Sequence, residues 1–260
     1  MKFGGTSVGD VAAFERVFHI VSTQIERRPV VVVSAMTKVT DALLNAFDIA
    51  KKGDAAEAFA ALEPHFERHV QVQEYFIPED ARSTFASELK YAREELSDLL
   101  IRVQRRALPL SMLKDAIVSY GEQLSSRLLA EVLKAKGVRA RQMDSRRLIV
   151  TDDEYGAAQP VWEETRDLVK LELQPVIDAG EVPIMGGFIA ASRGGETTTL
   201  GRGGSDYSAA LVAAALGSGE LQIWTDVTGV MTCDPRICSD ARTIPVLSYD
   251  EAAELAYFGA

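Results

Sequence analysis

The sequence is poor in features that mark exported, membrane-spanning or nucleic-acid-binding proteins. No apolar run approaches the roughly 20 residues that cross a bilayer, and the first residues lack the apolar core of a signal peptide. Only two cysteines, Cys233 and Cys238, occur among the 260 residues. The formal net charge of −10 lacks the basic excess that nucleic acids attract. We therefore expect a cytoplasmic protein with reduced thiols that binds neither membranes nor nucleic acid.

Two common phosphate-binding motifs and any clear metal-binding motif are also missing. There is no G-x-x-x-x-G-K-[ST] segment, and no G-x-G-x-x-G segment follows a predicted strand, which disfavours a P-loop kinase and a dinucleotide dehydrogenase. His65 and His69 lie one helical turn apart, but no third ligand accompanies them, and the two cysteines have no second pair. We predict no protein-built metal site, with both histidines on a solvated helix face.

The order of predicted elements indicates the fold class. Apolar residues make up 47% and charged residues 25%, as in soluble globular proteins, and the length suits one large α/β unit. A glycine-rich loop at Gly4–Gly9 precedes a helix that Asp10 opens, with apolar residues at 3- and 4-residue steps. Val30–Val33 then read as a buried parallel strand. Strand, glycine loop, helix and buried strand together predict a three-layer, doubly wound, mostly parallel sheet.

The rest of the chain extends this pattern. Residues 41–107 read almost entirely as helix and predict a helical insertion, and residues 110–137 read as two helical segments joined at Tyr120-Gly121-Glu122. Strands are predicted at 138–143, 147–151, 182–188 and 221–226, and further helices at 162–179 and 248–258. We find no internal repeat or linker, so we expect one domain over residues 1–260.

The segment Thr198–Asp206 is the strongest candidate for ligand binding. It holds three glycines in four positions, which let backbone N–H groups approach a ligand and point toward one place. Ser205 or Asp206 is predicted to cap the helix that follows, whose N-terminus favours an anion. Arg202 adds a planar fork of donors that suits phosphate or carboxylate. We therefore expect an anion site at this helix.

Three polar residues at other predicted strand and helix ends have alternative interpretations. Ser34 and Thr40 follow the valine strand at its carboxyl end, where open α/β sheets bind ligands, although Thr40 also suits a helix cap. Glu122 either interacts with the dipole at its helix start or pairs with a substrate ammonium. Cations and N–H donors gathered at one sheet edge are what phosphoryl transfer requires.

Four motifs together resemble the aspartate kinases, which belong to the amino-acid-kinase family. The motifs occur in the family's order along the whole chain: Lys2-Phe3-Gly4-Gly5-Thr6-Ser7-Val8, Ser119-Tyr120-Gly121-Glu122, Thr198-Thr199-Leu200-Gly201-Arg202-Gly203-Gly204-Ser205-Asp206, and Trp224-Thr225-Asp226-Val227 with Asp234-Pro235-Arg236. The resemblance implies ATP-dependent phosphorylation of the β-carboxylate of L-aspartate, a step toward lysine, threonine and methionine.

The resemblance also implies roles for individual residues. Lys2 and Asp206 would be catalytic, Lys2 neutralising the transferring phosphoryl group and Asp206 organising the reacting groups. Glu122 would pair with the substrate ammonium and Arg202 would clamp its carboxylate. Substrate contacts are implied for Ser34, Thr40, Glu122, Phe188, Arg202, Gly203, Gly204 and Ser205. Nucleotide contacts are implied for Lys2, Phe3, Gly4, Gly5, Ser7, Thr225, Asp226, Met231 and Arg236. Mg²⁺ would bridge the ATP phosphates, held largely by phosphate oxygens and water.

The chain departs from the family pattern at its C-terminal end. Met231 stands where many members have tyrosine, and the chain stops before a lysine that contacts ATP in the family. No regulatory ACT domain follows. We therefore expect a catalytic domain of a longer polypeptide, with regulatory or fused enzyme domains downstream and room for a homodimer. Two alternatives are a glutamate or acetylglutamate kinase of the same fold, and a nucleotide-binding fragment without turnover.

Overall fold

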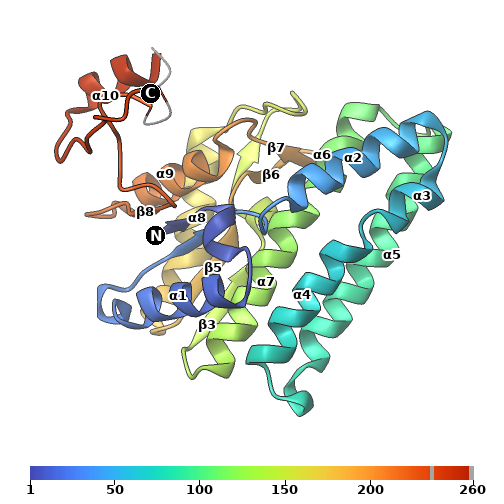
Figure 1. Ribbon diagram of the computed structural model, residues 1–260, viewed down its shortest axis with the longest axis horizontal. Helices are drawn as coiled ribbons and strands as arrows, with labels where there is room; N and C mark the ends of the chain where they lie inside the picture. Colours follow the sequence, from blue (N-terminus) through green and yellow to red (C-terminus); the bar gives the residue numbers. More distant parts are fainter. Residues whose placement is uncertain (235–236, 258–260) are drawn as a thin grey trace. The chain divides into compact units, whose positions relative to one another are not determined.

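The computed structural model describes residues 1–234 and 237–257, and the chain divides into two compact units, Met1–Trp224 and Thr225–Ala260 (Figure 1). The first unit is built on a five-stranded sheet in the order β3-β5-β2-β1-β8. Its strands are β1 (Lys2–Phe3), β2 (Val31–Val33), β3 (Ala140–Met143), β5 (Val182–Gly186) and β8 (Ile223–Trp224). Every neighbouring pair in this sheet is parallel, so all five carboxyl ends lie at one edge.

Helices cover both faces of this sheet. The covering helices are α1 (Val11–Ser22), α7 (Tyr120–Ala135), α8 (Trp162–Asp178) and α9 (Gly204–Leu216). The valines of β2 show that the two faces pack against different helices, because successive strand residues point to opposite faces. Val31 and Val33 belong to the core that includes residues of α1 and α7, whereas Val32 belongs to the core of α8 and α9. The predicted three-layer, doubly wound architecture is confirmed.

The predicted helical insertion is also confirmed. It consists of α2 (Val39–Lys52), α3 (Ala55–Ala60), α4 (Glu63–Phe76) and α5 (Ser83–Arg105). These helices pack on one another and against α7 and α6 (Leu110–Val118), beside the sheet (Figure 1). The predicted break between the two helical segments of 110–137 falls at Ser119, so Glu122 lies in the first turn of α7. Among the described residues, no helix combines the length and apolar character that a bilayer crossing requires.

The prediction of a solvated His65–His69 face is wrong. His69 is fully buried, because it falls on the stripe of α4 that also buries Phe66, Val72 and Phe76. Its Nδ1 lies 2.7 Å from the carbonyl oxygen of His65. Burial lowers the pKa of His69 to about 4, since an imidazolium cannot be solvated there. His69 therefore belongs to the packed interior of the helical insertion, whereas His65 is only half-buried.

A second, three-stranded sheet leads directly into the glycine-rich segment Thr198–Asp206. It contains β4 (Val150–Thr151), β6 (Ile189–Ser192) and β7 (Thr197–Thr199), with β4 parallel and β7 antiparallel to β6. The β6–β7 hairpin was not predicted. No strand was predicted at Thr198 and Thr199, which are buried strand residues.

Two predicted helix caps are wrong. Helix α2 begins at Val39 after Lys38, whose φ of 67° is left-handed, so Thr40 lies inside the first turn and caps nothing. Helix α9 begins at Gly204 after Gly203, at φ 74°, so Ser205 and Asp206 lie inside its first turn. In both cases a left-handed residue turns the chain into the helix without a side-chain cap. Asp10, by contrast, does cap α1, accepting from the N–H of Ala13 at 2.8 Å.

The second unit, described by itself, is mostly irregular. Met231 and Thr243 form an isolated antiparallel bridge, and α10 spans Tyr249–Tyr257 near the predicted bounds. Ser248 and Glu251 exchange hydrogen bonds at the start of α10: the Ser248 N–H donates to the Glu251 carboxylate, and the Glu251 N–H donates to Ser248 Oγ. This is a capping box, which satisfies N–H groups that the helix leaves free.

Candidate active site

A cavity of about 420 Å³ lies at the carboxyl ends of β1 and β2. Open α/β sheets bind their ligands at this edge, where loops from adjacent strands diverge. Its lining residues come from five separate parts of the first unit: Lys2, Gly5, Ser34, Ala35, Met36, Thr37, Lys38, Thr40, Asp41, Glu122, Phe188, Gly201, Gly203, Gly204, Ser205 and Asp206. The fold thus brings together residues that are as far apart in the sequence as Lys2 and Asp206.

An ion pair between Lys2 and Asp206 forms one wall of the cavity. Lys2 Nζ lies 2.9 Å from Asp206 Oδ1, and the lysine side chain is 10% exposed while the aspartate side chain is 52% exposed. A buried ammonium needs such a partner, and Asp206 in the first turn of α9 also benefits from the positive end of the helix dipole. Asp206 takes one of three lysine N–H donors, so the ammonium can also bind an anion in the cavity.

Glu122 forms a second wall and carries an incomplete set of hydrogen bonds. The residue is 3% exposed, and its Oε1 accepts from the Ala35 N–H at 3.1 Å. Its Oε2 has no hydrogen-bond partner among the described residues. Burial raises the pKa of Glu122 to about 8, although the Ala35 N–H opposes the rise. A carboxyl group placed in this way can accept a proton or bind a cationic group that enters the cavity.

The close approach of α7 to β5 explains how Glu122 reaches the cavity. A Cβ at Gly186 would lie 2.9 Å from Glu122 Cβ, so no larger residue fits there. Ser145 Oγ donates to the Gly186 carbonyl and fixes the end of the same strand. The contact requires glycine, which gives a physical reason for the glycine turn after the predicted strand at 182–188.

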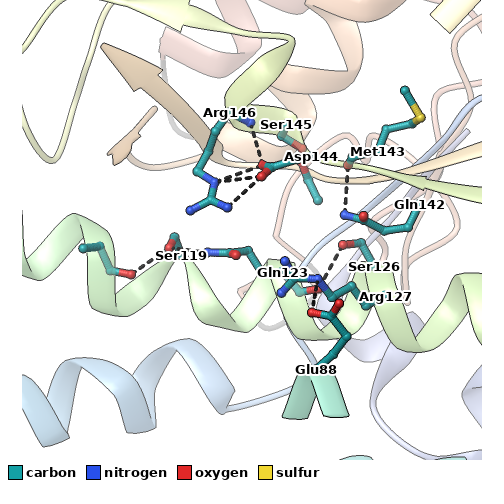
Figure 2. A network of polar contacts seen from close by, with 12 residues as sticks. Glu88, Ser119, Gln123, Ser126, Arg127, Gln142, Met143, Asp144, Ser145 and Arg146 are labelled. Carbon is teal, nitrogen blue, oxygen red and sulfur yellow. Dashed lines mark hydrogen bonds and ion pairs between the residues drawn. The ribbon is translucent and has the colours of Figure 1, made fainter. Parts of the chain in front are cut away.

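The polar side of α7 is held by a network of its own (Figure 2). Gln123 Nε2 donates to Ser119 Oγ at 2.8 Å, and Arg127 Nε lies 3.3 Å from Glu88 of α5. The neighbouring Asp144–Arg146 ion pair follows β3, and the Arg146 guanidinium lowers the pKa of Asp144 despite its burial. Apart from Nη1 of Arg127, which has no partner among the described residues, these polar groups are paired. Helix α7 can therefore bury both its apolar and polar faces, which keeps Glu122 in place.

The glycine-rich segment turns sharply between β7 and α9. Gly201 and Gly203 both have φ of 74°, a left-handed conformation that side chains rarely adopt. Gly203, Gly204 and Ser205 at the N-terminus of α9 line the cavity. A helix N-terminus favours an anion because its N–H groups and dipole point toward it. The predicted anion site is thus open to the cavity from the same side as Asp206.

Phe188 is held in a strained conformation beside this segment. Its φ is 66°, which is unusual for a bulky residue. The Phe188 N–H donates to Ser208 Oγ at 2.9 Å, and its carbonyl accepts from the Leu200 N–H at 2.9 Å. Ser208 is buried in α9 and donates in turn to the Gly204 carbonyl. Hydrogen bonds on both sides therefore hold the strained residue against the cavity.

The structure brings together many, but not all, of the residues singled out in the sequence. Lys2, Gly5, Ser34, Thr40, Glu122, Phe188, Gly203, Gly204, Ser205 and Asp206 line the cavity. Phe3 lies in the core and stacks on Trp224. Gly4 and Ser7 belong to the adjoining turn, and Arg202 is exposed without lining the cavity. Thr225, Asp226 and Met231 belong to the second unit, and Arg236 lies outside the described residues.

Several residues at or around the cavity were not predicted. Lys38 and Thr37 line it, and both lie in the 34–40 segment from which only Ser34 and Thr40 were chosen. Asp115 of α6 is 2% exposed, and its Oδ2 accepts from the N–H groups of Thr199 and Gly156, each at 2.8 Å. Asp115 is the single acid in the predominantly apolar stretch 110–118, and this was the available signal for it. It fixes the end of β7, where the glycine-rich segment begins.

Comparison with known proteins agrees with the fold. Residues 1–260 match the model of the amino acid kinase family. The chain is 39% identical over 267 residues to lysine-sensitive aspartokinase 3 of Escherichia coli K12, covering 100% of this chain and 56% of that protein. It is 38% identical over 266 residues to chloroplastic aspartokinase 1 of Arabidopsis thaliana, covering 100% of this chain and 45% of that protein.

A solved structure is similar over the same region. The crystal structure of E. coli aspartokinase III in complex with aspartate and ADP, in the R-state, matches with a TM-score of 0.90 and 36% sequence identity. The match covers 100% of this chain and 56% of that one. This chain therefore spans about half the length of the curated relatives it matches.

Proposed function

Because the chain belongs to the amino acid kinase family, we propose that it transfers the γ-phosphoryl group of ATP to the β-carboxylate of L-aspartate. One observation carries the proposal: a buried, half-bonded Glu122 and the Lys2–Asp206 pair line the same cavity. The first suits the ammonium of an amino acid, and the second suits a phosphoryl group. The similarity to a structure that holds aspartate and ADP supports this choice of substrates.

In the proposed reaction, a β-carboxylate oxygen attacks the γ-phosphorus of ATP, and the bond from that phosphorus to the ADP oxygen breaks. The products are ADP and aspartyl phosphate. The side chain of Lys2 neutralises charge on the transferring phosphoryl group, and Asp206 keeps the Lys2 ammonium in place. Such reactions depend mainly on positioning and on stabilising charge. Each well-placed donor to the developing charge lowers the barrier by about 3 kcal/mol.

The acceptor is bound on the other side of the cavity. We assign its ammonium to Glu122, with further contacts from Ser34, Thr40, Phe188 and Ser205. On the family resemblance alone, we assign its α-carboxylate to Arg202, which does not line the cavity in this structure. The N-terminus of α9, with Gly203 and Gly204, faces the β-carboxylate and the phosphoryl group. Thr225, Asp226, Met231 and Arg236 are assigned to the nucleotide, together with Gly4, Gly5, Ser7 and Phe3.

Mg²⁺ fits this site as an ion that arrives with the nucleotide. The described residues contain no group of three metal-ligating side chains, and an ion coordinated mainly by phosphate oxygens and water needs none. Asp206 is one of the carboxylates that line the cavity and could contribute a ligand. When bound, it would neutralise part of the phosphate charge. We extend the proposal to a homodimer in the cytoplasm; sedimentation of the purified protein would test the dimer, and cell fractionation would test the location.

The decisive experiment offers Mg-ATP and one acceptor at a time, with hydroxylamine present to trap acyl phosphates. L-Aspartate, L-glutamate, N-acetyl-L-glutamate and UMP are the acceptors, and release of ADP is measured. We expect ADP and hydroxamate to form with L-aspartate alone. Turnover only with another acceptor would replace aspartate in the proposal. If no ADP were released with any of the four acceptors, catalysis by this chain would be contradicted.

A further inference from the structure

Two loops that line the cavity are in direct contact through a side chain of one and the backbone of the other. The first follows β1 and contains the 3₁₀ turn Gly5–Val8 and Gly9; the second, 34–38, follows β2. Thr37 Oγ1 donates to the Gly5 carbonyl at 2.8 Å. A Cβ at Gly9 would lie 2.8 Å from the same Oγ1, so the loops are in close contact. Their relative position therefore sets one dimension of the cavity.

A single side chain from the helical insertion joins these two loops. Arg68 of α4 donates from Nη1 to the Thr37 carbonyl at 2.8 Å and from Nη2 to the Gly9 carbonyl at 2.7 Å. The planar guanidinium holds its donors in a fixed geometry, so both carbonyls are placed relative to one another. Hydrogen bonds from a charged donor are also stronger than neutral ones. Arg68 itself does not line the cavity, and it acts through these carbonyls.

We propose that Arg68 is a positioning residue for phosphoryl transfer. It holds the loop that contributes Gly5 at a fixed spacing from the loop that contributes Ser34 and Thr37, so that donor and acceptor meet in line. The inference rests on the proposed function, in which the first loop faces the nucleotide phosphates and the second faces the acceptor. A displacement of about 1 Å between reacting groups can cost roughly 100-fold in rate.

The chain offers a matched control in Arg82. This arginine also bonds two backbone carbonyls, donating from Nε to Ile77 and from Nη2 to Glu74, each at 2.8 Å. Those carbonyls lie at the C-terminal end of α4 and line no part of the cavity. Arg68→Gln and Arg82→Gln therefore remove the same kind of contact. The first removes it at the two loops that line the cavity, and the second removes it away from them.

The first test compares the steady-state kinetics of these variants. We expect Arg68→Gln to lower kcat about 10- to 100-fold, with Arg82→Gln within 2-fold of the unmodified chain. Arg68→Lys, which keeps the charge but loses the two-pronged geometry, should fall between them. Added guanidinium should restore part of the activity that Arg68→Ala loses, and it should not change the activity of Arg82→Ala. Equal losses in kcat for the two glutamine variants, or no loss in either, would overturn the inference.

The second test is independent of catalysis and uses hydrogen exchange without ligands. The amides of Ser7 and Val39 are hydrogen-bonded within or beside the two loops, to the carbonyls of Gly4 and Met36. Arg68→Gln and Arg68→Lys should accelerate exchange in peptides of both loops, whereas Arg82→Gln should leave them unchanged. Unchanged loop exchange in the Arg68 variants would refute the inference even if aspartate is phosphorylated. Accelerated exchange in a chain that phosphorylates another acceptor would support it and correct only the substrate.

Discussion

Glu122 and Asp115 are two buried acids of nearly equal exposure, 3% and 2%. They differ in how many hydrogen bonds their carboxyl groups accept. Asp115 accepts two backbone N–H groups on one oxygen, from Thr199 and Gly156. Glu122 accepts one, from Ala35, and its second oxygen lacks a partner within the described part of the chain. Burial raises the pKa of both carboxyl groups, and that of Glu122 rises to about 8. The difference indicates that Asp115 supports the fold whereas Glu122 is set to receive a ligand.

Replacing Glu122 by glutamine should give the largest effect. We expect the KM for L-aspartate to rise about 100-fold, because a buried charge partner of the substrate ammonium contributes about 3 kcal/mol. The KM for ATP should change less than 3-fold. Steady-state kinetics with each substrate varied in turn measures both values.

Two controls sharpen this test. Asp115→Asn makes the same acid-to-amide change outside the cavity and should leave the KM for aspartate within 3-fold. Succinate has the two carboxylates of aspartate but no ammonium, so its inhibition constant should be nearly the same with and without Glu122→Gln. A parallel rise in the aspartate and ATP KM values would contradict the role assigned to Glu122.

Replacing Asp115 by alanine should act on stability instead. It leaves the N–H groups of Thr199 and Gly156 without their acceptor, which costs about 2 kcal/mol of unfolding free energy. Urea denaturation followed by circular dichroism measures this loss, and Glu122→Gln should lose much less because one Glu122 oxygen is already unpartnered. If both variants lost the same stability, the contrast between the two acids would not hold.

Much of the fold was predictable because its signals are local. Val30–Val33 is a continuous apolar run, and the residues after Asp10 repeat at helical spacing, so β2 and α1 follow from periodicity. The β6–β7 hairpin lacked such a signal, because β7 is three threonines that continue into a glycine-rich segment. His69 was misplaced for a related reason, since a histidine on the buried stripe of a charged helix looks like a surface residue.

The residues that line the candidate site were predictable from the sequence, but the residues that hold them in place were not. Lys2, Glu122 and the segment around Gly203 belong to motifs that occur as short runs, and the structure places them around one cavity. Arg68 and Ser208 act on backbone groups of distant segments, which no residue pattern records. The burial of Glu122 was equally hidden, because its raised pKa depends on packing against Gly186 and on Ala35.

The pH dependence of stability should also separate the two acids, by a small effect at each pH unit. The folded-state pKa of Glu122, about 8, lies above its unfolded value of 4.5, so the folded chain retains a proton that the unfolded chain has already released. This contribution to stability is full below pH 4.5 and is lost as the pH rises through 8. We expect the ligand-free chain to lose about 1 kcal/mol per pH unit between pH 5 and 8 relative to Glu122→Gln.

Urea midpoints of both proteins across this range test that slope, with Asp115→Asn as the reference for a second buried acid. The pKa of Asp115 is also raised by burial, but its two N–H donors favour the charged form and oppose the rise. Its substitution should therefore leave the slope near neutral pH in place, whereas Glu122→Gln should abolish it. Saturating aspartate should flatten the slope too, because the substrate ammonium stabilises the Glu122 carboxylate and replaces its proton. A slope that survives Glu122→Gln would assign the titration to another group and remove the electrostatic argument for Glu122 as the ammonium site.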